Sequence, residues 1–260
     1  MILSGLTSNT FPSFAPKRII ELCQAAGLKG IEWQEYPHVP LGDLKAASRA
    51  RAVTEEAGMV VISYAVDKPV GRDALAGNEL PGIPILIETA GELGAEALRI
   101  RAGDLPPDET TEDERNRVAD WITSCVDRAG KQGLLIALDL HPRSLAPTGR
   151  HAVELMRRAD VGTAHVFWAP QDNASVDKNI EDLTLSRSSV LGLHGSGVDE
   201  TLGTTMLSEL TDRWARYLSV LRDVDDDHWF CLRGVEGDTV ESFYRDAQTL
   251  RRLAAKYGEE

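Results

Sequence analysis

Short apolar segments recur along the chain, each after a glycine that ends a helical pattern. The repeated stretches are AAGLKGIEW (25–33), EAGMVVISY (56–64), ELGAEALRIR (92–101) and KQGLLIALDLH (131–141). Glycine readily adopts the left-handed conformation that terminates a helix, so each stretch predicts a helix end followed by a strand. The four glycines are 31, 36 and 39 residues apart, which is the length of a strand–helix unit with its loops.

Similar patterns extend this alternation over the whole chain. Further apolar strands are expected at 2–6, 164–168, 189–194 and 228–233. Helical patterns cover 16–26, 41–57, 83–93, 111–132, 149–158, 207–223 and 239–257. Strict alternation favours parallel strands with helices outside, and eight strands in 260 residues predict a (β/α)8 TIM barrel that spans 1–260 as one domain. The alternative is an open doubly wound sheet, which usually has a glycine-rich phosphate loop after its first strand; SGLTSNTF is not such a loop.

The amino-acid composition says more about the possible binding partners than about the fold. The formal net charge is −13 and the pI is about 5.0, so repulsion disfavours nucleic acid and anionic membranes as partners. The three cysteines form no C-x-x-C pair, which argues against a disulfide scaffold. The N-terminus lacks the basic and apolar regions of a signal peptide, and no run of about 18 apolar residues is present. We therefore expect a soluble cytoplasmic protein that acts on a small molecule.

One predicted strand ends in an unusual pair of polar residues. In LIALDLHP (135–142), Asp139 and His141 follow four apolar residues. Side chains two apart on a strand point to the same face, so a carboxylate and an imidazole are expected side by side. The pair is either a structural hydrogen bond that closes the strand or part of a catalytic site.

Polar and aromatic residues also occur where the other strands of the predicted barrel end, which is where such barrels build their active sites. The candidate catalytic residues are Glu32, Asp139, His141, His194 and Arg233. The candidate substrate-binding residues are His38, Tyr64, Arg101, Trp168 and Glu236. Each also has a structural interpretation: Glu32 as the partner of a nearby arginine, Trp168 as a cap on the barrel, and Arg233 as a charge that neutralises a buried acid.

Five stretches together resemble the sugar phosphate isomerase/epimerase family, the xylose isomerase-like TIM barrels related to inosose dehydratase and, more distantly, to endonuclease IV. They are GIEWQEYPHVPLGDL (30–44), AGMVVISY (57–64), ALRIRAG (97–103), LLIALDLHP (134–142) and DTVESFYRDAQTL (238–250). The resemblance covers nearly the whole chain and depends on the order and spacing of the stretches. It implies the same barrel fold and, by analogy with such barrels, a homodimer.

The resemblance also implies a divalent cation such as Mn²⁺ or Mg²⁺ at the barrel mouth. The family's usual ligands are a Glu on strand five, an acid or amide on strand six, a His on strand seven and a Glu on strand eight. Asp139 and His194 occupy the first and third positions and are the candidate metal ligands. Ala169 and Arg233 occupy the other two, and neither side chain ligates a metal. If no cation binds, Arg233 is expected to supply the positive charge that stabilises an oxyanion.

Three functions remain open at this stage. The first is an isomerase or epimerase that acts on a keto-sugar or similar polyhydroxylated carbonyl compound through an enediolate. The second is a lyase or dehydratase of the same family, and the third is a ligand-binding barrel without catalysis. A DNA-repair role is disfavoured, since it needs a basic surface and a cluster of metal ligands.

Overall fold

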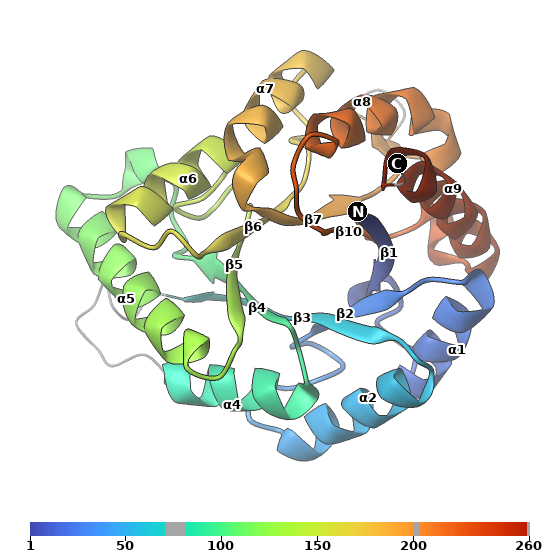
Figure 1. Ribbon diagram of the computed structural model, residues 1–260, viewed down its shortest axis with the longest axis horizontal. Coiled ribbons are helices and arrows are strands. Elements are labelled where there is room, and N and C mark those ends of the chain that lie inside the picture. The colour runs from blue at the N-terminus through green and yellow to red at the C-terminus, as the bar shows by residue number, and fades with distance from the viewer. Residues whose placement is uncertain (71–81, 200–202, 259–260) are drawn as a thin grey trace.

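Eight parallel strands close into a barrel, and helices form a ring around it (Figure 1). The computed structural model describes residues 1–70, 82–199 and 203–258. The barrel strands are β1 (Ile2–Thr7), β2 (Gly30–Gln34), β3 (Val60–Val70), β4 (Ala97–Ala102), β5 (Leu135–Asp139), β6 (His165–Trp168), β7 (Val190–Gly195) and β10 (His228–Leu232). Each pairs with its neighbours in chain order, and β10 pairs with β1 to close the barrel. The predicted (β/α)8 fold is confirmed.

The helices of the outer ring alternate with the strands. They are α1 (Pro16–Ala26), α2 (Leu44–Glu56), α4 (Ile83–Leu93), α5 (Glu112–Gly130), α6 (Gly149–Arg158), α7 (Val176–Ser186), α8 (Thr211–Leu221) and α9 (Val240–Gly258). Among the described residues, none of them is both long and apolar enough to cross a membrane. A short antiparallel ladder, β8 (Val198–Asp199) with β9 (Gly203–Thr204), lies in the loop after β7.

Two elements differ from the sequence prediction. Helix α7 was not predicted, although Val176, Ile180 and Leu183 recur at helical spacing. Ser175 starts it by accepting a hydrogen bond from the backbone N–H of Lys178. Strand β3 runs six residues beyond the predicted end at Tyr64. Its register on β4 shifts between Val66 and Pro69, so the added part lies beyond an irregularity that apolar periodicity does not reveal.

The lower part of the barrel interior is filled by a small apolar cluster. Ile62, Ala137, Phe167, Trp229 and Cys231 pack together there, buried from solvent. Gly30 leaves the room that these side chains need: a Cβ atom at this position would lie 2.7 Å from Ile62 and 2.8 Å from the Trp229 ring. On three strands a charged residue follows two positions further along: Glu32 after Gly30, Asp139 after Ala137 and Arg233 after Cys231. The barrel is therefore apolar at its base and polar toward the carboxyl ends of its strands.

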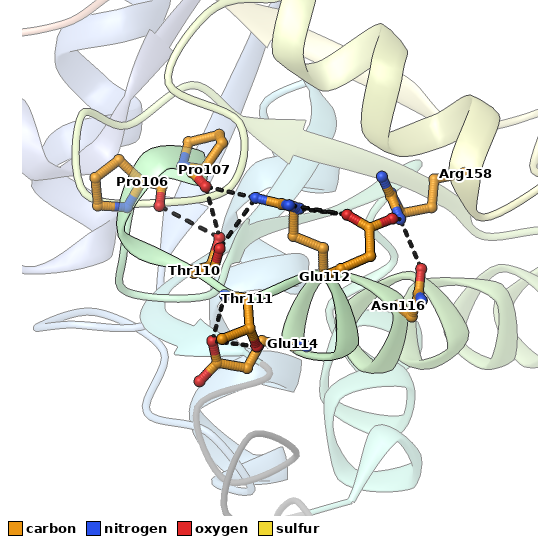
Figure 2. A network of polar contacts seen from close by, with 9 residues as sticks. Pro106, Pro107, Thr110, Thr111, Glu112, Glu114, Asn116 and Arg158 are labelled. Atoms are coloured by element: carbon orange, nitrogen blue, oxygen red, sulfur yellow. Dashed lines mark hydrogen bonds and ion pairs between the residues drawn. The ribbon is translucent and has the colours of Figure 1, made fainter.

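The loop between β4 and α5 is held by a polar network on the rim of the barrel (Figure 2). Thr111 and Glu114 form a capping box at the start of α5, with Thr111 N–H donating to the Glu114 carboxylate at 2.7 Å. Arg158 of α6 pairs with Glu112 and donates to Asn116 Oδ1 at 2.6 Å. These contacts fasten α5 to α6 and fix the loop that follows strand β4.

Candidate active site

A buried carboxylate, Glu32, lies at the carboxyl end of β2 and has no exposed surface. Its Oε2 accepts hydrogen bonds from Ser63 Oγ at 2.6 Å and Arg99 Nε at 2.9 Å. Its Oε1 accepts from Gln34 Nε2 at 3.0 Å and lies 3.1 Å from His194 Nε2. Burial opposes ionisation, but Arg99 and His194 outweigh it and hold the pKa of Glu32 below its ordinary range. Glu32 is therefore an ionised, fully hydrogen-bonded acid.

The cation at the centre of the barrel is Arg99, on β4, which is 1% exposed. Its Nε contacts Glu32, and its Nη1 pairs with Asp139 at the end of β5. Desolvation favours the neutral form, yet Asp139 and Glu32 raise the pKa of Arg99 above its ordinary value. One guanidinium thus joins two strand-end carboxylates that are both buried.

These residues do not form a site for a divalent cation. Asp139 is paired with Arg99, and His194 is hydrogen-bonded to Glu32, so both predicted ligands have other partners. In the described part of the chain, no three His, Cys, Asp or Glu side chains are grouped closely enough to hold a metal. The Arg99 guanidinium places a positive charge beside the carboxylates that a divalent cation would need as ligands. These residues form an ion-pair network centred on Arg99 instead of a metal site.

His194, on β7, forms a dyad with Glu32. Its ring is 2% exposed and stacks on Phe167, with 5.2 Å between ring centroids. Burial lowers the pKa of His194, although Glu32 raises it in part, so the imidazole is neutral. Nε2 therefore has the proton that it donates to Glu32. Among the residues described, Nδ1 is buried without a hydrogen-bond partner, and its lone pair is unused.

His141 lies in the loop after β5, which ends at Asp139, so the two residues do not form the predicted pair on one strand. Asp139 pairs with Arg99 instead, and His141 Nδ1 accepts from the backbone N–H of Arg143 at 3.1 Å. This bond places the ring proton on Nε2. Burial and the charge of Arg101 lower the pKa of His141, so it is a neutral imidazole with an N–H donor.

A pocket of about 550 Å³ opens beside these groups. His141, His194, Ser196 and Arg233 contribute to its wall, and the loop after β6 contributes Gln171, Asp172 and Asn173. Glu32, Arg99 and Asp139 are buried and do not belong to this lining. The structure thus separates the predicted catalytic residues into three that line the pocket and two that belong to the buried ion-pair network.

Three of the predicted substrate-binding residues are buried and bonded within the protein. Tyr64 donates its hydroxyl to the Val39 carbonyl at 2.9 Å, and Trp168 donates Nε1 to Asp182 at 3.1 Å. His38 Nδ1 lies 3.0 Å from Ser8 Oγ. Tyr64 and Trp168 have no exposed surface, so neither contacts a substrate in this conformation. Their role in substrate binding stays a prediction.

The other two predicted substrate-binding residues are partly exposed. Arg101 donates from Nε and Nη2 to the Arg143 carbonyl at 3.1 and 2.9 Å, which ties the end of β4 to the loop after β5. Glu236 lies half-buried on the turn after β10. Neither belongs to the pocket lining, and their contact with substrate also stays a prediction.

Two residues of this region were not among the predicted site residues. Arg99 ends a predicted strand, but nothing local distinguishes it from Arg101 two positions later. Asp67 lies in the part of β3 beyond its predicted end; its side chain is 56% exposed and its Oδ1 is 4.0 Å from Arg99 Nη2. Burial raises the pKa of Asp67, and Asp139 adds to the effect. Asp67 is the accessible carboxylate next to Arg99.

The fold is similar to that of solved xylose isomerase-like TIM barrels. The probable 3-DHS dehydratase AsbF of Bacillus anthracis, involved in petrobactin synthesis, has a TM-score of 0.76 and 14% identity, covering 96% of this chain and 99% of that one. The 3-keto-D-glucoside 4-epimerase YcjR of E. coli has a TM-score of 0.74 and 16% identity, covering 97% and 100%. A xylose isomerase domain protein from Planctomyces limnophilus has a TM-score of 0.67 and 13% identity, covering 99% and 97%.

No family model matches the sequence, and no curated protein matches it. At these identities the solved structures establish the xylose isomerase-like fold, as the resemblance predicted, and do not establish a reaction. The reaction has to be argued from the side chains of the pocket.

Proposed function

We propose that the protein is an isomerase or epimerase that moves a proton next to the carbonyl group of a keto-sugar or similar polyhydroxylated compound. The observation that supports this most is the dyad of Glu32 and His194. A neutral imidazole with a free Nδ1 lone pair, held by an ionised carboxylate on its other nitrogen, is a general base. His194 also lies in the wall of the pocket.

In this proposal His194 Nδ1 takes the proton from the carbon next to the carbonyl. The electrons of the broken C–H bond form a carbon–carbon double bond, and the carbonyl oxygen becomes the oxyanion of an enediolate. Return of the proton to the former carbonyl carbon, with transfer of the hydroxyl proton on the first carbon to the enediolate oxygen, completes an isomerisation and leaves the carbonyl group on the first carbon. Return of the proton to the same carbon from the other face completes an epimerisation. Glu32 stabilises the imidazolium that exists between these two transfers.

His141 serves the developing oxyanion. His141 lines the same pocket, and its neutral ring has the proton on Nε2. Nε2 can therefore donate a hydrogen bond to the oxyanion without breaking an ion pair within the protein. The positive charge of Arg233 in the same wall favours the enediolate over the neutral ketone.

The second proton transfer that an epimerase needs is assigned to Asp67. This carboxylate is exposed, its pKa is raised, and it lies near Arg99 at the end of β3. Arg99 itself is a positioning residue, because it is buried and holds Glu32 and Asp139 in place.

Proton exchange in heavy water tests the proposal. The protein is incubated in D₂O with a panel of ketoses and 3-keto-sugars, and proton NMR follows loss of the signal next to the carbonyl and appearance of an epimer or isomer. We expect exchange by the natural protein and its loss in His194→Gln. His228→Gln is the matched control, since His228 is also 2% exposed but lies on the pocket at the opposite end of the barrel.

Exchange that is unchanged in His194→Gln would contradict the assigned base. Absence of exchange and product with every carbonyl compound, together with tight binding of one of them, would favour the ligand-binding barrel.

Elimination is the second candidate, supported by the similarity to the probable dehydratase AsbF. Abstraction of the same proton is followed by departure of a hydroxyl group from the next carbon, which leaves as water after protonation. Mass spectrometry of the product separates the two reactions, because only elimination removes water.

A further inference from the structure

Among the described residues, Arg233 differs from the buried Arg99 in making no ion pair, although the Asp67 carboxylate interacts with it electrostatically at longer range. Arg233 follows β10, and its backbone N–H donates to the Gly195 carbonyl at 2.7 Å, which fixes the main chain at the pocket. In the described ranges, its guanidinium makes no ion pair and no side-chain hydrogen bond, while Arg99 pairs with two carboxylates. Arg233 is half-buried and lines the pocket, and the described residues give its guanidinium no hydrogen-bond acceptor.

The rest of the pocket wall combines apolar residues of the loops after β5 and β6 with a few neutral polar ones. Ser196, Asn173 and Gln171 line it, and Asn179 holds the backbone of Gln171 through bonds of 2.8 and 3.1 Å to its N–H and carbonyl. Asp172 is the one carboxylate among the described lining residues. Hydroxyl and amide groups at these positions suit a polyhydroxylated molecule.

The charge of Arg233 acts on the groups around it. Burial is the main cause of the low pKa of both His141 and His194, and Arg233 lowers both further. An arginine without an ion pair in a pocket wall is explained if its anionic partner is part of the ligand.

We propose that Arg233 binds a carboxylate or phosphate group of the substrate, so that the protein acts on an anionic polyhydroxy compound such as a sugar acid or sugar phosphate. Guanidinium pairs with either oxyanion through two parallel N–H···O bonds. The substrate is then held at its charged end by Arg233, and His141 is left to contact the carbonyl oxygen. This inference rests on the proposed function for the reaction, but anion binding is measurable without turnover.

The test uses three polyols that differ in charge and lack a carbonyl group: D-gluconate, D-glucitol 6-phosphate and neutral D-glucitol. Isothermal titration calorimetry gives Kd for each with the natural protein and with Arg233→Gln, Arg233→Lys and Arg222→Gln. Arg222 is the matched control, because it lies on the pocket at the opposite end of the barrel and its loss changes the net charge equally. Circular dichroism establishes that each variant is folded.

We expect at least one anion to bind about tenfold or more tightly than glucitol, as charge-assisted hydrogen bonds provide. Arg233→Gln removes this preference, Arg233→Lys keeps part of it, and Arg222→Gln leaves it unchanged. Which anion binds decides between a carboxylate and a phosphate. The inference is overturned if neither anion binds more tightly than glucitol, or if the preference persists in Arg233→Gln.

The outcomes also separate this inference from the proposed reaction. Anion preference without proton exchange on any carbonyl compound keeps the anion site and removes the isomerase. Proton exchange on neutral ketoses without anion preference keeps the isomerase and removes the anion site.

Discussion

The guanidinium of Arg99 lies 2.9 Å from the carboxylate of Glu32, and the two side chains are 1% and 0% exposed. The same guanidinium pairs with Asp139, so two strand-end acids depend on one buried cation. The free-energy cost of burying these charges is compensated only while Arg99, Glu32 and Asp139 are all present.

Arg99→Met is expected to lower the free energy of unfolding by about 3–5 kcal/mol, because it leaves two buried carboxylates without their cation. Urea denaturation followed by circular dichroism measures the change. Arg51→Met is the control: Arg51 pairs with Glu55 on the exposed face of α2, and its loss is expected to cost less than about 1 kcal/mol. A loss below about 1 kcal/mol for Arg99→Met would mean that the network is not needed for stability.

Divalent cations are expected to bind poorly. Protein that is treated with a chelator, incubated with Mn²⁺ and desalted should retain less than one metal per chain by plasma mass spectrometry, since Arg99 already neutralises Glu32 and Asp139. Arg99→Gln is expected to retain more Mn²⁺ than the natural protein because it frees both carboxylates. One metal per chain in the natural protein, lost in Asp139→Ala and His194→Ala, would show that the ion-pair network rearranges to ligate metal.

The rate of the proposed proton transfer is expected to fall at acidic pH, where His194 becomes protonated and can no longer act as a base. The pKa of His194 is lowered by burial and raised in part by Glu32, so Glu32→Gln should move the acidic limb of the kcat profile to lower pH. The same variant is expected to lower kcat on the order of 10²–10⁴-fold with a smaller change in KM. An acidic limb at the same pH in both proteins would exclude His194 as the titrating group.

Acid is expected to destabilise the protein partly through His228. This residue is 2% exposed, its Nδ1 lies 2.7 Å from the Val190 carbonyl, and burial lowers its pKa. The unfolded chain therefore binds a proton that the folded one does not, and stability is lost as pH falls below about 6.5 toward the folded pKa.

Urea denaturation at pH 7 and pH 5 measures this effect. The free energy of unfolding of the natural protein should drop more between these values than that of His228→Gln, which cannot titrate. Equal drops would show that the protonation of His228 is the same in the folded and unfolded chains.

The barrel was predictable from local pattern. Helix-terminating glycines such as Gly27 and Gly94 adopt the left-handed conformation, with φ of 72° at both, and the apolar strands after them pair with their neighbours in chain order. These features depend on a few consecutive residues, which is why periodicity detects them. Helix α7 was missed although Val176, Ile180 and Leu183 recur at helical spacing, so the pattern was present but was not recognised.

The sequence by itself determined that polar side chains gather where the apolar strands end, because parallel strands end at one rim of the barrel. It did not determine their partners. Arg99 and Arg233 both stand at strand ends, yet one is buried between Glu32 and Asp139 and the other is unpaired in the pocket wall. That difference depends on distances between strands far apart in the chain and on which side chains exclude water. The distances between strands and the exclusion of water are both set only when the barrel closes.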